Sequence, residues 1–232
     1  MSGSRPYTTL FLLVSADGKT STGSTDEMDV DRDFPNIPGV GQGLKQYYDL
    51  QIETDEFSLN TGKTLAKTGV NQKQDCTEQL PVSFVVVDSA PHLTGQGTSH
   101  LAHRGRQLLV VTTNPAHPAL ALRATLGNLH MLHYDKIDFT HLFDRLKQDF
   151  GVTRMTIQSG GSLNATLVRA GLVDRILLVV APALIGGKDT PTPMDGESLH
   201  TTAVLSNIKP LDLVQATALQ DSYVLLEYKV RN

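Results

Sequence analysis

The sequence has one cysteine, Cys76, and no tryptophan among its 232 residues. A single cysteine excludes an internal disulfide, which fits a reducing cytoplasm as the expected compartment. It also excludes a zinc site with several thiolate ligands. No uninterrupted apolar run reaches about 18 residues, so no membrane-spanning helix is expected. The apolar run at residues 7–14 is too short for a signal peptide, and we interpret it as a buried strand.

An excess of basic charge is also lacking. The chain has 20 Lys and Arg against 24 Asp and Glu, a net charge of −4. This balance gives no support to nucleic acid or an anionic membrane as a partner. Apolar residues make up 40% and charged residues 19%, as in ordinary globular proteins. The sequence therefore indicates a globular protein whose core needs no disulfide or metal to hold it.

Segments of strand and helix character alternate along the chain. Apolar, β-branched runs between turn residues predict strands, and amphipathic runs predict helices. The predicted strands cover residues 7–14, 81–89, 107–114, 130–134, 154–158, 175–184, 202–208, 211–219 and 222–230, and the predicted helices cover residues 44–53, 137–151 and 162–170. The last two strands are expected to form a hairpin around residues 220–222. Between the first strand and the first helix we expect a long ordered loop, a feature that is often functional.

The clearest helix is the one predicted at residues 137–151. Its apolar side chains fall on one stripe, at Phe139, Leu142, Phe143, Leu146 and Phe150. Asp138 is placed to cap its first turn, and Gly151 is placed to end it.

The alternation of strands and helices predicts an α/β fold with a largely parallel sheet, and the helix-poor tail predicts antiparallel strands at one edge. Ligands of open α/β sheets bind outside the carboxyl ends of the strands. In this sequence the predicted strand ends are small or polar, at Asp88-Ser89, Thr112-Thr113-Asn114 and Ser159-Gly160-Gly161. Turn chemistry alone explains part of this pattern, and a ligand site explains the rest.

Several familiar motifs are absent. NTGKT at residues 60–64 is not a phosphate-binding P-loop, because Phe57 stands where the first glycine is needed. The glycines of PGVGQGL at residues 38–44 have the wrong spacing for a dinucleotide fingerprint. The histidine pairs at residues 100 and 103 and at residues 130 and 133 lack further ligands in register, so no metal site is expected. No G-x-S-x-G elbow is present, which argues against a serine hydrolase.

Gly160 and Gly161 lie between a predicted strand and a predicted helix. On local grounds the pair serves equally well as a tight turn or as a phosphate cradle. In the second case the amides of Ser162 and Leu163, at the positive end of the helix dipole, would face the phosphate. Glycines without side chains would let a pyrophosphate approach closely.

Four segments together resemble the reductase of riboflavin biosynthesis, a relative of dihydrofolate reductase. They are RPYTTLFLLVSADGKTST at residues 5–22, NTGKT, PVSFVVVDS at residues 81–89 and, most specifically, GGSLNATLVRAGLVDRILLVVAPALIGG at residues 160–187. The resemblance implies one reductase domain over residues 1–232 with a dihydrofolate reductase-like, doubly wound sheet. It further implies an NADPH cofactor, a homodimer, and hydride transfer to a ribosylamino-pyrimidine phosphate.

The resemblance also implies roles for individual residues. Asp17, or a water that it holds, becomes the candidate proton donor, although an Asp before Gly18 also suits a simple turn. Asp88 could accept from a ribose 2′-hydroxyl, which would favour NAD, or stand aside while Ser89 and Thr112 take a 2′-phosphate. The implied cofactor-binding residues are Thr64, Asp88, Ser89, Thr112, Gly160, Gly161, Ser162 and Leu163, and the implied substrate-binding residues are Ser15, Lys19, Gln158 and Ser159.

Two departures from the family pattern concern the substrate side. The family usually has Glu before its Gly-Gly pair, where this chain has Ser159, and Asp-Asp-Pro after its Gly-Thr turn, where this chain reads LAKTGVN. Two alternatives therefore stay open: a reductase of the same fold that acts on another small heterocycle or carbonyl, and a dinucleotide-binding homologue without catalysis. The zinc-binding deaminase pattern that accompanies some members is absent, since one cysteine cannot build that site.

Overall fold

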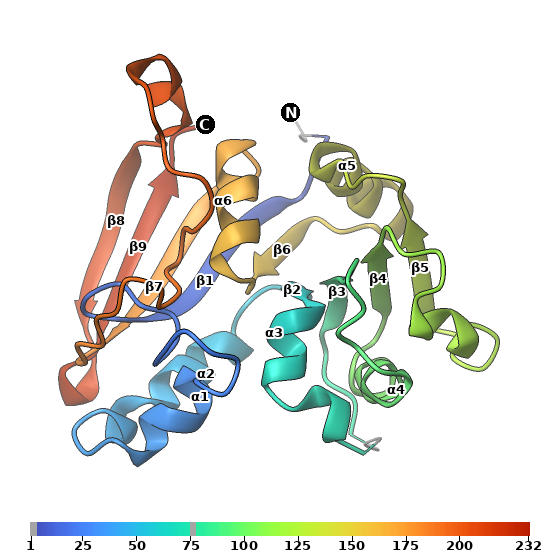
Figure 1. Cartoon of the computed structure of the whole chain (residues 1–232), viewed down its shortest axis with the longest axis horizontal. Coiled ribbons are helices and arrows are strands. Elements are labelled where there is room, and N and C mark those ends of the chain that lie inside the picture. Colours follow the sequence, from blue (N-terminus) through green and yellow to red (C-terminus); the bar gives the residue numbers. More distant parts are fainter. Residues whose placement is uncertain (1–3, 75–77) are drawn as a thin grey trace. The chain divides into compact units, whose positions relative to one another are not determined.

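The structure is a computed structural model that describes residues 4–74 and 78–232; Cys76 lies outside the described residues. The described chain divides into two compact units (Figure 1). Unit 1 comprises the N-terminal residues up to Pro6 and Asp55–Ser159, and unit 2 comprises Tyr7–Thr54 and Gly160–Asn232. The single reductase domain expected over residues 1–232 stays a prediction.

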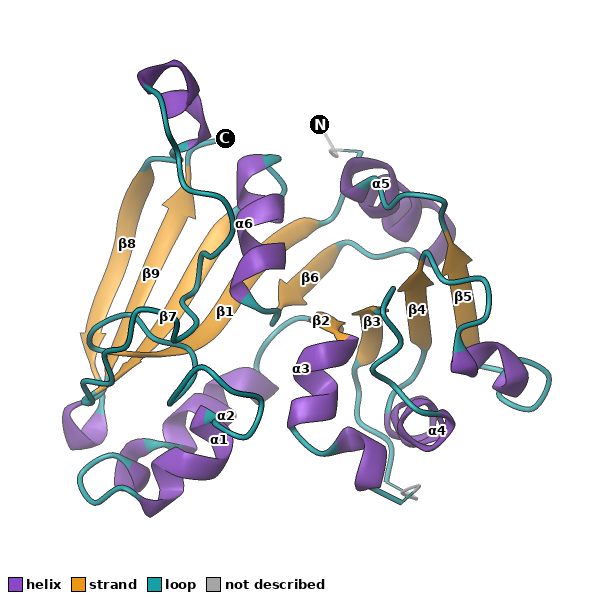
Figure 2. Ribbon diagram, in the orientation of Figure 1, coloured by secondary structure: helices purple, strands orange, loops and turns teal. Residues whose placement is uncertain are grey.

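Unit 1 is built on five parallel strands in the order β5-β4-β3-β2-β6 (Figure 2). Their central strands are buried on both faces, which explains their continuous apolar runs: Leu108, Leu109, Val110 and Val111 are fully buried. The strands are β2 (Phe57–Thr61), β3 (Ser83–Val87), β4 (Leu108–Thr112), β5 (Leu129–His133) and β6 (Arg154–Ile157), and the α-helices are α3 (Gly62–Lys67), α4 (Gly95–Arg104) and α5 (Phe139–Phe150). Short 3-10 turns lie at η3 (Val70–Gln72) and η4 (Pro118–Leu122).

Helix α5 forms as its sequence predicts. The Asp138 side chain accepts hydrogen bonds from the amides of Thr140 and His141 at the first turn. Gly151 ends the helix in the left-handed conformation, with φ of 69°. Leu142, Phe143 and Leu146 on the apolar stripe are fully buried. Local sequence suffices to predict this helix because the capping residue, the apolar stripe and the terminating glycine all lie within one segment.

Unit 2 contains four strands in the order β1-β7-β9-β8. β1 (Tyr7–Ser15) and β7 (Arg175–Ala181) are parallel, whereas β9 (Val224–Val230) is antiparallel to β7 and to β8 (Leu211–Ala218). The C-terminal hairpin is therefore antiparallel, as predicted. The helices are α1 (Val30–Asp33), α2 (Lys45–Ile52) and α6 (Gly161–Arg169), with 3-10 turns at η1 (Phe34–Asn36), η2 (Gly41–Gly43), η5 (Thr202–Asn207) and η6 (Gln220–Ser222).

The core of unit 2 lies on one face of these strands. Its buried members include Phe11 and Leu13 of β1 and Val179 of β7, packed with Phe34 and Leu44 from the 30–44 segment. The expected long loop is therefore partly helical and supplies core side chains. Tyr223, also fully buried, donates from its hydroxyl to the carbonyl of Val40 at 2.8 Å.

On the opposite face, the outer strands β7, β9 and β8 carry apolar side chains that are half-buried or exposed. Register places Tyr228 of β9 beside Ile176 of β7 and Leu213 of β8, and Leu226 beside Leu178. Leu225 packs instead with the core cluster, so alternate residues of β9 face opposite sides. Leu213 is 60% exposed. We call this surface the open apolar face, and define it by Ile176, Leu178, Leu213, Leu226 and Tyr228.

The structure differs from the predictions at residues 202–208 and at β2, α1, α3 and α4, which were not predicted. Residues 202–208 do not form a strand; the segment is the exposed 3-10 turn η5, with Leu205 at 53% exposure. A short apolar run becomes a strand only where a neighbour completes its hydrogen bonds, and here none of the described strands pairs with it. Helix α4 was not predicted, because its first turn contains Gly95 and Gly97, and glycine disfavours helix formation. Thr94 caps that turn, and Gly97 is needed where Asn71 packs closely.

Candidate functional site

The parallel strands of unit 1 bring three polar strand ends to one edge. Thr61 at the end of β2 pairs with Val87 of β3, and Val87 pairs with Val111 of β4. Asp88 therefore follows the middle strand, between the start of α3 and Thr112. Edges of this kind are where open parallel sheets bind their ligands.

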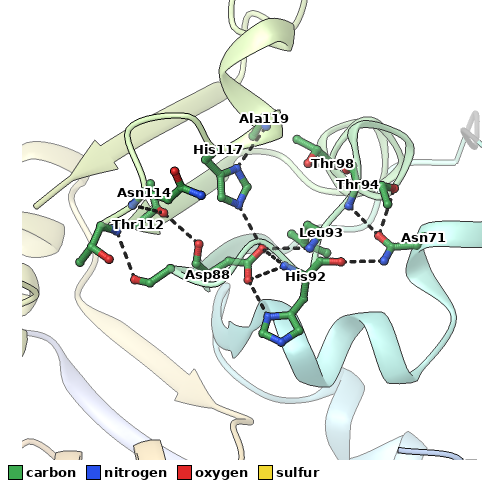
Figure 3. A network of polar contacts seen from close by, with 12 residues as sticks. Asn71, Asp88, His92, Leu93, Thr94, Thr98, Thr112, Asn114, His117 and Ala119 are labelled. Atoms are coloured by element: carbon green, nitrogen blue, oxygen red, sulfur yellow. Dashed lines mark hydrogen bonds and ion pairs between the residues drawn. The ribbon is translucent and has the colours of Figure 1, made fainter.

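Asp88 is fully buried, and its carboxylate is saturated by protein donors (Figure 3). It accepts from the backbone amide of Leu93 at 2.9 Å and from the amide of His92 at 3.0 Å. It also contacts the imidazole Nδ1 of His92 at 3.1 Å and Nε2 of His117 at 3.0 Å. A Cβ added at Gly62 would lie 2.2 Å from its Cγ, so α3 packs directly on the carboxylate. Asp88 thus organises the turn after β3, and its oxygens are not open to a ribose hydroxyl.

The protonation of His117 follows from its two contacts. Its Nδ1 accepts from the amide of Ala119 at 3.1 Å, so this nitrogen carries no proton. The proton of the neutral ring then lies on Nε2 and is donated to Asp88. His117 is therefore a buried, neutral link between Asp88 and the start of η4.

The other cofactor residues expected on unit 1 also have partners within the chain. The Thr112 hydroxyl donates to the carbonyl of Asp88 and accepts from the amide of Asn114, and Thr112 is only 1% exposed. The Ser89 hydroxyl accepts from the amide of Thr113 at 3.1 Å. The Thr64 and Thr61 hydroxyls contact each other at 2.8 Å. The strand end thus holds Thr112 inward and leaves Ser89 half-buried at the edge.

A small pocket of about 180 Å³ lies at the ends of β4 and β5. Its lining is mostly apolar, with amide and imidazole groups among the side chains. The lining residues are Thr112, Asn114, Pro115, Leu120, Met131 and His133.

In unit 2, the first turn of α6 has the features of a phosphate cradle. Gly160 at the N-cap position has an extended backbone and offers no side chain to cap the helix. Among the described residues, no acceptor is recorded for the amides of Gly161, Ser162 or Leu163. A Cβ at Gly160 would meet nothing within 4 Å, so the space beside it is open. Unpaired amides at a helix N-terminus bind anions, and this geometry fits a pyrophosphate.

Gly161 is required for a different reason. A Cβ there would lie 2.3 Å from the carbonyl oxygen of Thr192 and 2.4 Å from a carboxylate oxygen of Asp195. The amide of Asp195 donates to the Gly161 carbonyl at 3.1 Å, and Asn164 donates to the carbonyl of Pro193. The turn at residues 192–195 therefore packs against this side of the helix. Of the two glycines, only Gly160 faces open space.

The expected substrate residues after β1 are bound into a turn. Asp17 accepts from the Ser15 hydroxyl at 2.6 Å and from the backbone amides of Ile185 and Gly186. These hydrogen bonds, the one from Ser15 first, lower the pKa of Asp17 to about 2. Lys19 donates to the carbonyls of Gly187 and Thr190. Asp17 is thus ionised near neutral pH and joins two loops, and its role in supplying a proton, directly or through a water that it holds, stays a prediction.

Acid should weaken this junction. A carboxyl whose pKa is lowered by folding stabilises the protein above its unfolded pKa of 3.8, and this stabilisation is lost as the pH falls through about 2. Asp17→Asn should therefore be less stable than the unmodified protein near neutral pH, and the gap should close below about pH 4. Denaturant unfolding of both proteins at a series of pH values measures this difference in stability. A gap that persists undiminished to about pH 2 would show that the charge is not involved.

The two residues before Gly160 belong to unit 1. The amide of Gln158 donates to the carbonyl of Leu59, and its side-chain oxygen accepts from the Ser58 hydroxyl. Ser159 is 5% exposed. Their expected role toward a substrate stays a prediction.

Sequence reasoning missed His92, His117 and Asn71. The spacing between histidines does not reveal them, because His92 lies four residues after Asp88 and His117 twenty-nine residues after it. The signal available was a buried strand-end Asp followed by a nearby His. Within residues 4–74 and 78–232 the structure has no group of three or more His, Cys, Asp or Glu side chains placed to hold a metal ion. The same residues include no helix that is long and apolar enough to cross a membrane.

Comparison with solved structures defines the class of fold. The chain superposes on RibD of Acinetobacter baumannii with a TM-score of 0.70, over 100% of this chain and 60% of that one, at 17% identity. It superposes on the Saccharomyces cerevisiae riboflavin biosynthesis reductase Rib7 with a TM-score of 0.64, over 100% and 92% of the two chains, at 14% identity. The fold is thus the dihydrofolate reductase-like α/β fold, which confirms the predicted class.

Sequence comparison narrows this class to one family. The chain belongs to the RibD C-terminal domain family, whose sequence model matches residues 6–225. It is 26% identical to the 2,5-diamino-6-ribosylamino-4(3H)-pyrimidinone 5′-phosphate reductase of Methanothermobacter thermautotrophicus, over 98% of this chain and 99% of that protein. It is 23% identical to the riboflavin biosynthesis protein RibD of Actinobacillus pleuropneumoniae, over 97% of this chain but 57% of that protein. The resemblance seen in the sequence is confirmed at the level of the family.

Proposed function

We propose that this protein is an NADPH-dependent reductase that transfers a hydride to a ribosylamino-pyrimidine phosphate. The observation that carries the proposal is the match with the Methanothermobacter reductase, which runs nearly end to end in both chains. The open first turn of α6 supports it, because that turn fits a dinucleotide pyrophosphate. A cytoplasmic location stays a prediction.

The chain's own contribution would be binding and orientation. NADPH, when bound, supplies the hydride, and the amides of Gly161, Ser162 and Leu163 would hold its pyrophosphate. Rate enhancement would then come from holding the reacting carbon in line with the hydride. Reduction also needs a proton. Because Asp17 is ionised and bound to backbone amides, we assign the proton to solvent water.

The test is NADPH oxidation with the pyrimidine phosphate as acceptor, followed by the loss of NADPH absorbance. Turnover with this acceptor, and not with simple ketones, supports the proposal. Turnover only with other heterocycles or carbonyls would favour a different substrate on the same fold. NADPH binding without any turnover would favour a homologue that has lost catalysis. A different substrate stays an alternative because Ser159 stands where the family usually has Glu.

We also propose a homodimer that uses the open apolar face. Apolar surface of this kind, on the outer strands of a sheet, is normally covered. The resemblance to a dimeric family supports a second copy of the chain as its cover. A two-fold arrangement would place the same face of both copies in contact.

Leu213→Asp should therefore weaken the dimer without unfolding the subunit. Leu213 is 60% exposed, so the substitution costs the isolated subunit little, whereas a carboxylate in an apolar contact is strongly unfavourable. We expect at least a tenfold weaker association, about 1.4 kcal/mol, by analytical ultracentrifugation. Gln215→Asp is the matched control, because Gln215 pairs with Glu227 on the other face of the hairpin. Equal association of the two variants would refute this interface.

A further inference from the structure

Strand β2 carries two polar side chains at positions where a central strand is normally apolar. It lies between β3 and β6, and its residues Ser58 and Asn60 are each only 7% exposed. Their register partners on β3 are Phe84 and Val86, which are apolar as expected for a strand covered on both faces. Burying a polar group costs stability unless the group is paired. Ser58 and Asn60 therefore need a reason other than packing.

The two side chains belong to a hydrogen-bond chain that ends on β6. The side-chain amide of Asn60 donates to the Ser58 hydroxyl at 2.9 Å, and this hydroxyl donates to the side-chain oxygen of Gln158 at 3.2 Å. The parallel register that pairs Leu59 with Ile157 continues to Asn60 and Gln158, so their side chains leave the sheet on the same face. Because neighbouring strands lie about 4.8 Å apart, the two carboxamides start side by side.

The two ends of this chain are open and of opposite kind. Within the described residues no partner is recorded for the side-chain oxygen of Asn60 or the side-chain nitrogen of Gln158. Neither atom is among the enclosed, unpaired atoms of the described side chains, so both reach accessible space. The Ser58 hydroxyl has one hydrogen, so it donates to one carboxamide and accepts from the other. One end is therefore always an acceptor and the other a donor, even if both amides are turned over.

An acceptor beside a donor is the complement of a lactam edge, in which a ring N–H stands next to a carbonyl. The N–H would donate to Asn60, and the carbonyl would accept from Gln158. The 4(3H)-pyrimidinone in the name of the Methanothermobacter reductase has such an edge, because its N3–H stands beside the C4 carbonyl. A simple ketone or a carboxylate has no N–H and would satisfy only one end of the chain.

We propose that Asn60 and Gln158, joined through Ser58, recognise the lactam edge of a pyrimidinone substrate. All three side chains belong to unit 1. The inference rests on the proposed function for the identity of the ring. It adds Asn60 as a specificity-determining residue and Ser58 as a positioning residue, and neither role is implied by the resemblance to the family.

Asn60→Leu separates recognition from a structural role. Leucine is close in shape to asparagine and suits a buried strand, and Ser58 would keep its bond to Gln158. Thermal stability should therefore be retained. The KM for the pyrimidinone phosphate should rise at least tenfold, about 1.4 kcal/mol, with a smaller change in kcat, because the edge is bound alike in the ground and transition states. A merely structural role would give the reverse, a loss of stability with an unchanged KM.

The matched control is Thr156→Val, on the same face of β6. Thr156 is the register partner of Ser58 and is 1% exposed. Its hydroxyl is already engaged by Asp55, whose carboxylate accepts from it at 3.1 Å and whose amide donates to it at 3.2 Å. This variant should lose stability and keep its KM. An equal rise in KM for Thr156→Val and Asn60→Leu would overturn the assignment of the edge to Asn60.

The ligand offers a second change that needs no variant. Methylation of the pyrimidinone phosphate at N3 removes the N–H and leaves the carbonyl. Calorimetry on the full chain should show at least tenfold weaker binding of the methylated ring, because it leaves the Asn60 oxygen without a donor. Asn60→Leu should bind the two rings nearly alike. Equal binding of the two rings by the unmodified protein would overturn the inference.

Binding and turnover together distinguish this inference from the proposed function. If the unmodified protein oxidises NADPH with the pyrimidinone phosphate, and Asn60→Leu keeps both its KM and its discrimination against the methylated ring, only the inference fails. If the unmodified protein binds the pyrimidinone phosphate in preference to its methylated form but oxidises no NADPH, the lactam site stands and the proposed reaction fails. If it binds neither ring, both fail.

Discussion

Asp88→Ala is expected to remove about 3–5 kcal/mol from the free energy of unfolding, because it takes away the acceptor shared by several buried donors. The amides of His92 and Leu93 and the Nε2 hydrogen of His117 would all lose their partner. Each buried donor left without an acceptor costs about 1–3 kcal/mol. Urea unfolding followed by circular dichroism measures the change.

Two further variants make this test specific. Asp138→Ala removes an aspartate that caps α5 through exposed hydrogen bonds, and such a cap contributes about 1 kcal/mol. Asp88→Asn keeps the size of the side chain but has only one acceptor oxygen, so its loss should fall between the other two. A smaller loss in Asp88→Ala than in Asp138→Ala would contradict the role given to Asp88.

Gly160→Val should lose NADPH affinity but keep its stability, whereas Gly161→Val should lose stability. At Gly160 the backbone is extended and a Cβ would meet open space, so valine should leave the fold intact. It would occupy the space where a pyrophosphate approaches, and NADPH affinity should fall at least tenfold, about 1.4 kcal/mol. At Gly161 valine would collide with the Thr192 carbonyl and Asp195, so stability itself should fall.

Thermal unfolding and NADPH titration of both variants separate the two effects. A folded Gly160→Val protein with unchanged NADPH affinity would place the phosphate cradle elsewhere. A Gly161→Val protein as stable as the original would show that the 192–195 turn moves aside at little cost. Gly151→Ala is a reference for stability loss without any effect on NADPH binding, because Gly151 ends α5 with φ of 69°, a conformation that strains alanine.

Features that depend on nearby residues could be predicted from the sequence. Helix α5 has its cap, apolar stripe and terminating glycine within one segment, and β3 and β4 of unit 1 are continuous apolar runs that predict buried strands. The antiparallel hairpin at the C-terminus, with its turn around residues 220–222, was also predicted. Local patterning fixes these elements because their hydrogen bonds or packing periods are local.

The roles of site residues depended on partners far along the chain. The pKa of Asp17 is lowered first by the nearby Ser15 hydroxyl and then by amides 168 and 169 residues later, and these two distant partners could not be read from the turn that contains it. Asp88 is joined to His117, 29 residues away. The sequence also could not show which glycine of the pair faces open space. The strand expected at residues 202–208 was wrong for a related reason, since a strand needs a neighbour that its own sequence does not reveal.

The division of the chain into units has a consequence for its synthesis. Residues 55–159 form the main part of unit 1 as one continuous segment, whereas unit 2 is assembled from residues on both sides of that segment. β1 emerges early from the ribosome, but its register partner β7 begins at Arg175, which pairs with Thr9. The apolar β1 strand of the nascent chain therefore lacks its β7 partner during the whole time in which residues 55–159 are synthesised. Translation that stalls before β7 would leave that strand exposed to chaperones and to other chains.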